Sequence, residues 1–233
     1  MRDQAVRDGD VAGLDTWVVV PLFREEAVVG DVVRALRVPF RRVVCVDDGS
    51  GDRSGHEARR AGAVVVRHPL NLGQGAAIQT GLDYALADPS MKYVLTFDAD
   101  GQHRVEDAVE MVARLRRGEA DVVLGSRFLD RRTVLSWQRR SVLRLAATHA
   151  RLTTGLAVTD THNGLRAMTR DVASRLRLTQ SRMAHASQLL EQVAAMDVVH
   201  VEQPVHILYT PYSRQKGQSL WNSVNIITES LFR

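Results

Sequence analysis

Apolar residues in the first half of the chain alternate between short continuous runs and stripes of helical period. The runs are rich in β-branched residues, as expected of strands buried on both faces. They predict strands over residues 16–22, 42–47, 63–67, 92–97 and 121–125. The stretches between them predict helices over residues 25–36, 54–61, 74–87 and 105–116. This alternation predicts an α/β fold in which a mostly parallel, Rossmann-like central sheet is flanked by helices.

The second half of the chain has a less regular pattern. Its apolar spacing predicts a basic helix over 135–153, a return to the sheet within 159–168, a helix over 184–196 and a strand within 198–208. A helical period of leucine, valine and isoleucine over 220–232 predicts an amphipathic C-terminal helix. Since no repeat or linker interrupts the pattern, the simplest organisation is a single domain over residues 1–233.

Two aspartates, Asp98 and Asp100, directly follow the predicted strand 92–97. Residues two apart on an extended backbone point to the same side, so both carboxylates converge beyond the edge of the sheet. Two like charges this close are unfavourable unless a cation lies between them. Oxygen ligands favour Mg²⁺ or Mn²⁺, and Mg²⁺ usually keeps water and phosphate oxygens in its shell. The pair predicts a metal–diphosphate site, with a solvated Asp-Gly turn as the alternative.

Polar residues also follow the other predicted strands, at the edge where parallel α/β sheets bind their ligands. Arg24 and Glu25 follow the first strand, Asp47 and Asp48 the second, and Asn71 the third. Carboxylates there accept hydrogen bonds from a base or a ribose, and the glycine-rich turn after Asn71 presents backbone N–H groups. The alternative is that these loops only cap helices and close turns.

Arginine dominates the basic residues, since Lys92 and Lys216 are the only lysines in the 233 residues. The formal net charge is +4. A guanidinium pairs bidentately with phosphate oxygens and therefore suits phosphate recognition. The basic cluster at 127–151 lacks the aromatic interleaving of a nucleic-acid site. We therefore expect an acidic ligand or an anionic membrane surface, and no nucleic acid partner.

The single cysteine, Cys45, excludes an internal disulfide and lies within a predicted strand, where we expect a small buried side chain and not a nucleophile. Residues 1–15 are polar and charged, which argues against a signal peptide. No stretch approaches the roughly 20 apolar residues of a membrane-spanning helix. These features favour a cytoplasmic protein.

Several of these segments, taken in order, resemble the family 2 glycosyltransferases of the GT-A fold. The matching segments are VPLFREE at 20–26, VDDGS at 46–50, NLG at 71–73, FDADGQH at 97–103 and GSRF at 125–128. Within that family the likeness is strongest to polyprenyl-phosphate, or dolichol-phosphate, sugar synthases, and it continues through 160–166 and 202–205 to 212–219. The resemblance divides the chain into a nucleotide-sugar-binding half, 16–128, and an acceptor half, 129–233.

The resemblance also implies roles for individual residues. A UDP- or GDP-sugar would be bound by Pro21, Leu22, Phe23, Glu25, Asp47, Asp48, Asn71, Gln74, Asp98, Ala99, Arg214 and Lys216. Asp98, Asp100 and Gln102 would surround the metal, and Arg127 would meet the acceptor phosphate, helped by Arg139 or Arg140. The chain departs from the family pattern at Phe23-Arg24, where Tyr-Asn is usual, and at Gln74, where lysine is common. The transmembrane hairpins of many relatives are also missing.

The implied reaction transfers a sugar, with inversion at the anomeric carbon, to an acceptor for which polyprenyl phosphate is the first expectation. A metal held by Asp100 and its partner neutralises the departing diphosphate. A lipid phosphate is already anionic, whereas a hydroxyl acceptor needs a carboxylate as general base. Asp160 and Glu191 are the candidates for that base. Their local alternatives are turn formation by Asp160 and simple solvent exposure of Glu191 on its helix.

Other functions stay open on the sequence alone. A hydroxyl acceptor in cell-wall or polysaccharide synthesis would use the same fold, and a non-catalytic nucleotide-sugar-binding subunit would share the donor site. With a lipid acceptor, we expect a peripheral enzyme at the inner face of the membrane. Its basic helix and C-terminal helix would contact the bilayer or a small membrane-protein partner.

Overall fold

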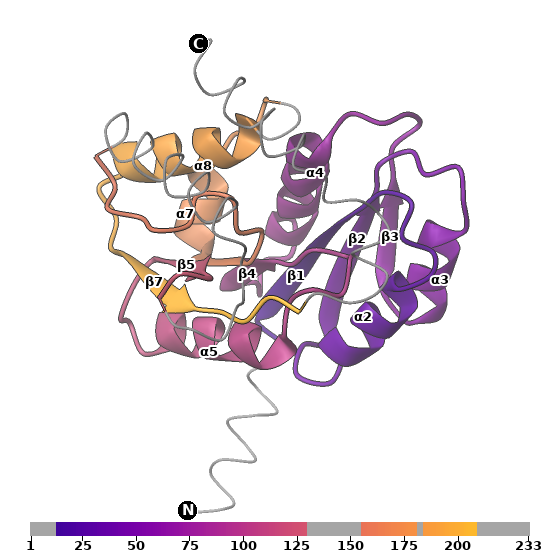
Figure 1. The fold of residues 1–233 in the computed structure, drawn as a ribbon, viewed down its shortest axis with the longest axis horizontal. Helices are drawn as coiled ribbons and strands as arrows, with labels where there is room; N and C mark the ends of the chain where they lie inside the picture. The colour runs from indigo at the N-terminus through magenta and orange to yellow at the C-terminus, as the bar shows by residue number, and fades with distance from the viewer. Residues whose placement is uncertain (1–12, 130–154, 181–183, 209–233) are drawn as a thin grey trace, which may run out of the picture.

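A seven-stranded sheet with helices on both faces forms the protein (Figure 1). The computed structural model describes residues 13–129, 155–180 and 184–208. The strands are β1 Thr16–Leu22, β2 Arg42–Asp47, β3 Val64–Arg67, β4 Tyr93–Thr96, β5 Val122–Ser126, β6 Arg166–Thr169 and β7 His200–Pro204. The helices are α2 Val29–Leu36, α3 Ser54–Arg60, α4 Gln74–Leu86, α5 Val105–Arg116, α7 Arg170–Arg175 and α8 Ala184–Ala195.

The strands lie in the order β3-β2-β1-β4-β6-β5-β7. β6 runs antiparallel to both β4 and β5, and every other pair is parallel. The prediction of a mostly parallel sheet is therefore confirmed. Because β1, β2 and β4 are parallel, their carboxyl ends meet at one edge, and the loops that follow them come together there.

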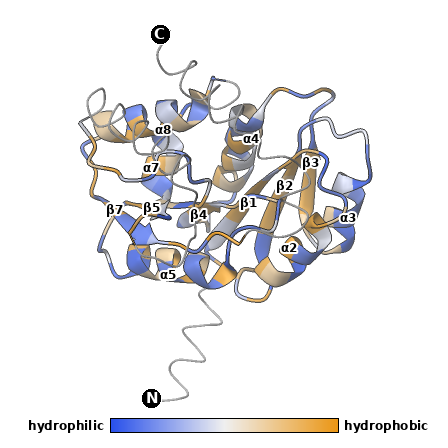
Figure 2. Ribbon diagram, viewed as in Figure 1, coloured by the Kyte–Doolittle hydropathy of each residue, from blue (hydrophilic) through white to orange (hydrophobic). Residues whose placement is uncertain are grey.

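Strand residues alternate between two apolar cores, one on each face of the sheet. Val18, Val20 and Leu22 of β1 pack on the side of α2, α3 and α5, while Val19 packs on the side of α4, α7 and α8. In Figure 2 the strands β1, β2 and β3 have mainly hydrophobic colours, and the helices around the sheet have mixed colours. A Cβ on Gly81 of α4 would collide with Val19. Glycine there lets α4 lie close on β1, which brings its first turn to the carboxyl edge.

Several predicted elements match the structure residue for residue, namely 16–22, 42–47 and 105–116. The helix predicted from residue 25 begins only at Val29, because residues 25–28 form a turn in which the Glu25 carbonyl accepts the Val28 and Val29 N–H groups. Within 159–168, only Arg166 onward joins the sheet, and α7 was not predicted. The helices expected over 135–153 and 220–232 lie outside the described residues. No helix in the described ranges has the length and apolarity to cross a membrane.

Candidate active site

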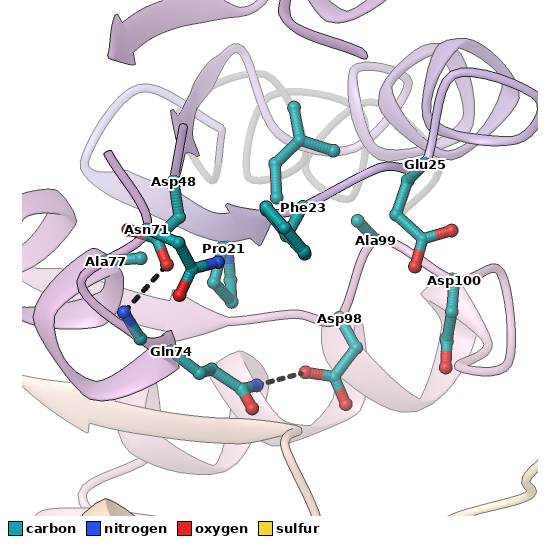
Figure 3. Close-up of a pocket in the computed structure, with 12 residues that line it drawn as sticks. Pro21, Phe23, Glu25, Asp48, Asn71, Gln74, Ala77, Asp98, Ala99 and Asp100 are labelled. Atoms are coloured by element: carbon teal, nitrogen blue, oxygen red, sulfur yellow. Dashed lines mark hydrogen bonds between the residues drawn. The ribbon is translucent and has the colours of Figure 1, made fainter. Parts of the chain in front are cut away.

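A cavity of about 440 Å³ opens at the carboxyl edge of β1, β2 and β4 (Figure 3). It is lined by Pro21, Leu22, Phe23, Glu25, Asp48, Asn71, Gly73, Gln74, Ala77, Asp98, Ala99 and Asp100. Most of the residues to which the sequence assigned a donor-binding role are in this set. They come from four separate segments, namely the end of β1 with the loop after it, the loop after β2, the turn into α4 with its first residues, and the loop after β4. We call it the donor cavity.

The aspartate pair projects into the donor cavity from the loop after β4. Asp98 is oriented from two sides, because its Oδ1 accepts a hydrogen bond from Gln74 Nε2 at 3.2 Å and its Oδ2 lies 2.9 Å from His103 Nε2. Asp100 Oδ1 accepts the backbone N–H of Gln102 at 3.0 Å. Glu25 lies on the same side of the cavity as Asp100 in Figure 3.

The two carboxylates have opposite pKa shifts. Burial works to raise the pKa of Asp98, but the hydrogen bond and charge of His103 and the charge of Arg166 outweigh it and hold the pKa below its ordinary value. Burial and the neighbouring Asp98 charge raise the pKa of Asp100 to about 6. Divergent shifts of this kind arise when two carboxylates share one site. A bound cation would relieve the repulsion between them.

The chemistry of this pair fits a divalent cation. In the part of the chain that the structure describes, no three His, Cys, Asp or Glu side chains are grouped to hold a metal ion by themselves. Two carboxylates suit Mg²⁺ or Mn²⁺, because these ions take their remaining ligands from water and phosphate. Gln102 is buried and does not line the donor cavity. Its carbonyl accepts the Leu208 N–H at 2.8 Å, and its role at the metal stays a prediction.

Asp47 and Asp48 lie on different faces of the sheet. Asp48 lines the donor cavity, whereas Asp47 lines a second cavity of about 340 Å³ together with residues of α3 and β3. Asp47 Oδ1 accepts the Ser50 N–H at 2.9 Å, and Asp47 Oδ2 lies 3.7 Å from Arg67 Nε. Adjacent residues at a strand end point to opposite faces, so only one of them reaches the donor cavity. The structure thus separates two residues that the sequence had grouped as donor contacts.

Phe23 lies at the rim of the donor cavity and is 38% exposed. The Arg24 guanidinium lies 5.0 Å from the centroid of the Phe23 ring, within the range of a cation–π contact. Arg24 has a positive φ of 56°, and its N–H donates to Ser50 Oγ at 3.0 Å. The Phe-Arg pair that departs from the family pattern is thus held by local contacts beside the cavity.

Arg127 and Asp160 are partners in the structure. Arg127 Nε donates to Asp160 Oδ2 at 2.6 Å, and the backbone N–H of Arg127 reaches the same oxygen at 3.2 Å. Both side chains are buried. Arg127 Nη2 also donates to the His162 carbonyl at 3.3 Å. The carboxylate considered as a general base is therefore engaged with the arginine considered for the acceptor phosphate, and neither lines the donor cavity.

Glu191, the other candidate base, is exposed on α8. The packed face of that helix carries Leu189, Leu190 and Val193. The structure therefore gives Glu191 a solvent-facing position. The remaining predicted arginine and lysine contacts, Arg139, Arg140, Arg214 and Lys216, lie outside the described residues.

Three residues with no assigned role in the sequence analysis shape the site. His68 is buried with its Nδ1 2.7 Å from Asp48 Oδ1. Gly164 lies so close to Asp98 that an added Cβ would overlap both carboxylate oxygens. Arg166 is buried on β6, where Nη2 donates to the Thr161 carbonyl at 3.3 Å. Gly164 and Arg166 lie in the segment 160–166, through which the family resemblance continues, but no sequence spacing connects His68 to Asp48.

Comparison with known proteins gives matches along most of the chain. The profile of the family "Glycosyl transferase family 2" matches residues 17–177. An uncharacterized protein of Methanocaldococcus jannaschii is 30% identical over 97% of this chain and 95% of its own. Polyprenol monophosphomannose synthase of Mycolicibacterium smegmatis is 31% identical over 70% of this chain and 65% of its own. UDP-N-acetylglucosamine–dolichyl-phosphate N-acetylglucosaminyltransferase of Methanococcus voltae is 26% identical over 88% of this chain and 90% of its own.

A similar solved structure is glucosyl-3-phosphoglycerate synthase from Mycobacterium tuberculosis, in complex with Mn²⁺, UDP-glucose and phosphoglyceric acid. The TM-score is 0.64 at 18% identity, over 94% of this chain and 80% of that chain. At this identity the likeness concerns the fold. The expected GT-A architecture is confirmed.

Proposed function

Because the chain belongs to glycosyl transferase family 2, we propose that it moves a sugar from a nucleoside diphosphate to a polyprenyl phosphate, with a divalent cation and inversion at the anomeric carbon. The chain is a glycosyltransferase that uses a nucleotide-sugar donor. Relatives named for polyprenol and dolichyl phosphates support the choice of a lipid phosphate as acceptor.

The donor cavity supports the first half of this proposal. Asp98 and Asp100 would hold Mg²⁺ or Mn²⁺, which neutralises the diphosphate as it departs. Gln74 and His103 fix the orientation of Asp98, so one carboxylate is set before the donor binds. Phe23 and Asn71, on the cavity wall, would contact the base and ribose of UDP or GDP. The similar structure solved with Mn²⁺ and UDP-glucose supports this choice of cation and donor.

The pairing of Arg127 with Asp160 is the observation that carries the acceptor assignment. A hydroxyl acceptor requires a carboxylate to take its proton, yet Asp160 is buried in an ion pair and Glu191 faces solvent on α8. A phosphate monoester is already ionised at neutral pH and needs only to be positioned. Arginine suits that task, and Arg127, with Arg139 or Arg140, would provide it. Arg127 Nε and Nη2 are engaged with Asp160 and the His162 carbonyl, so Arg127 would have to exchange these contacts for the phosphate.

The same assignment gives the two halves of the chain distinct tasks. Residues 16–128 would form the donor half, and residues 129–233 would form the acceptor half within one domain. A lipid-phosphate acceptor places the enzyme at the membrane surface. We infer a cytoplasmic, peripheral enzyme at the inner face, with the bilayer or a small membrane protein as its partner.

Turnover of a donor panel tests the proposal. The purified protein would receive UDP- and GDP-sugars with Mg²⁺ or Mn²⁺, with and without a short polyprenyl phosphate, and release of nucleoside diphosphate would be measured. We expect release that requires both metal and lipid, is lost in Asp100→Ala, and persists in Asp31→Asn. Asp31 is a matched control, because it is exposed on α2, where it pairs with Arg34 at the surface. Polyprenol and soluble sugars, added in parallel as hydroxyl acceptors, would support the hydroxyl reaction if they alone gave release. Donor binding without any turnover would support a binding subunit.

A further inference from the structure

His68 is a buried histidine whose two ring nitrogens both have partners. It follows the end of β3, and its backbone N–H donates to the Asp47 carbonyl at 2.9 Å. Its Nδ1 lies 2.7 Å from Asp48 Oδ1 and its Nε2 lies 2.9 Å from Thr80 Oγ1. Since an ionised carboxylate only accepts, Nδ1 carries the hydrogen, and in the neutral ring Nε2 accepts from the Thr80 hydroxyl. The ring therefore links β3, the end of β2 and the middle of α4.

The Asp48 carboxylate accepts the hydrogen bonds that hold the turn before α4. Its Oδ1 accepts the Leu72 N–H at 2.9 Å as well as His68, and its Oδ2 accepts the Gly73 N–H at 2.8 Å. Gly73 has a φ of 96°, a conformation that suits glycine alone. Three donors on one carboxylate leave little capacity for a ligand. Within the described residues, the hydrogen bonds of Asp48 therefore serve mainly to hold the turn before α4.

That turn carries two side chains of the donor cavity, Asn71 on one side of it and Gln74 on the other. Gln74, the first residue of α4, donates to Asp98 Oδ1, and Figure 3 draws this bond and the bond from Gly73 to Asp48 as dashed lines. A continuous series of contacts thus runs from His68 through Asp48 and the turn to a carboxylate of the aspartate pair.

We propose that His68 is a positioning residue of the donor site, which acts by donating to Asp48 and so fixing the turn at residues 71–73. The expected effect of His68 on donor binding rests on the proposed function, whereas its effect on the turn at residues 71–73 does not. Loss of the Nδ1 donor leaves Asp48 Oδ1 with the Leu72 N–H as its remaining described donor. The turn then samples conformations in which Asn71 and Gln74 leave their places in the cavity. Donor binding weakens, while the reacting groups themselves are unchanged.

Two amide substitutions separate donation from packing. The side-chain nitrogen of His68→Asn falls near the position of Nδ1 and keeps a donor for Asp48, whereas that of His68→Gln falls near Nε2 and keeps only the contact with Thr80. Both variants replace a buried ring by a smaller polar group. His56→Ala removes an exposed histidine of α3 and serves as the control. Unfolding curves for all variants check that each is folded at the temperature of measurement.

The primary readout is amide hydrogen exchange of Leu72 and Gly73, measured without any substrate. We expect faster exchange at both amides in His68→Gln, and rates near those of the wild type in His68→Asn and His56→Ala. In turnover, His68→Gln should raise the KM for the donor by about tenfold, the size of one lost hydrogen bond to a charged group, with a smaller change in kcat. Equal exchange in His68→Gln and His68→Asn would overturn the proposal. A wild-type protein that turns over no donor would contradict the proposed function. Hydrogen exchange at Leu72 and Gly73 would still decide whether His68 fixes the turn.

Discussion

Arg127 and Asp160 form a buried ion pair that joins the end of β5 to the segment before β6. Nε of Arg127 lies 2.6 Å from Oδ2 of Asp160, and the same oxygen is within 3.4 Å of Asn163 Nδ2. This geometry fixes the guanidinium against the segment before β6, where it also donates to the His162 carbonyl. It also engages the Asp160 carboxylate in an ion pair with Arg127. For this reason we favour an acceptor that needs no general base.

Asp160→Ala should destabilise the protein because it leaves the Arg127 guanidinium buried without its carboxylate. We expect the free energy of unfolding to fall by about 3 kcal/mol, as for other buried pairs that lose one partner. Urea unfolding measures the change. Asp171→Ala is the matched control, since Asp171 pairs with Arg175 at the surface and its loss should cost less than about 1 kcal/mol. Equal effects of the two substitutions would contradict the structural role given to Asp160.

Gly164→Ala should displace the Asp98 carboxylate and so disrupt the aspartate pair. The added Cβ would overlap the Asp98 carboxylate, so that side chain must move away from Gln74 and His103. We expect Mn²⁺ affinity and turnover to fall together, the latter by about 10²-fold, as for other small displacements of reacting groups. Gly51→Ala is the control, because its Cβ meets nothing within 4 Å. Unchanged Mn²⁺ binding in Gly164→Ala would show that Asp98 is not a metal ligand.

The raised pKa of Asp100 predicts a pH dependence of stability in the metal-free protein. Between its ordinary value of 3.8 and its folded value of about 6, the folded protein holds a proton that the unfolded chain has lost. The contribution of Asp100 to stability therefore falls as the pH rises from about 4 to 6. Asp98 acts in the opposite sense, because its lowered pKa gives stability that is lost as the pH falls below its ordinary value.

Asp100→Asn isolates the first of these contributions. We expect the variant to lose the decline in urea midpoint between about pH 4 and 6 that Asp100 produces in the wild type. Chelator in the buffer keeps the comparison free of metal. A wild type and variant with parallel pH profiles would mean that Asp100 titrates at its ordinary value.

Cys45 should report on unfolding. Burial, and then the charge of Asp47, raise the pKa of its thiol to about 12, and the side chain is fully buried in β2. A disulfide reagent at pH 8 should therefore react with the unfolded chain and hardly with the folded protein, because the thiolate is the reactive form. The rate of modification should rise with urea in step with the unfolding transition. Rapid modification in the absence of urea would contradict the burial of Cys45.

The fold was largely predictable because strands buried on both faces of a parallel sheet have continuous apolar, β-branched sequences. The β-branched runs of β1 and β2 and the apolar stripe of α5 match the structure residue for residue. Predictions failed where tertiary contacts decide the conformation. The start of α2 is set by the turn at Glu25, and α7 is a six-residue helix that packs through Val172 and Ala173.

The donor cavity was predictable in part, for a related reason. Residues that end parallel strands must meet at one edge, so Asp48, Asn71 and the aspartate pair could be grouped from sequence alone. Which of two adjacent residues faces the cavity depends on the strand, and Asp47 turned out to face the opposite side. Pairings between distant residues left no local signal. The partners of Asp48 and Asp160, His68 and Arg127, were therefore found only in the structure.

A phosphate acceptor is distinguished from a hydroxyl acceptor by comparing two lipids that differ only at the reacting end, polyprenyl phosphate and the matching polyprenol. The wild-type protein would receive each with the donor and the metal, and the lipid product would be identified by mass spectrometry. We expect a glycosyl phosphate lipid from the polyprenyl phosphate, none from the polyprenol, and none from either acceptor with Asp100→Ala. A glycosylated polyprenol, with no product from the phosphate, would contradict the claim that this enzyme glycosylates a lipid phosphate.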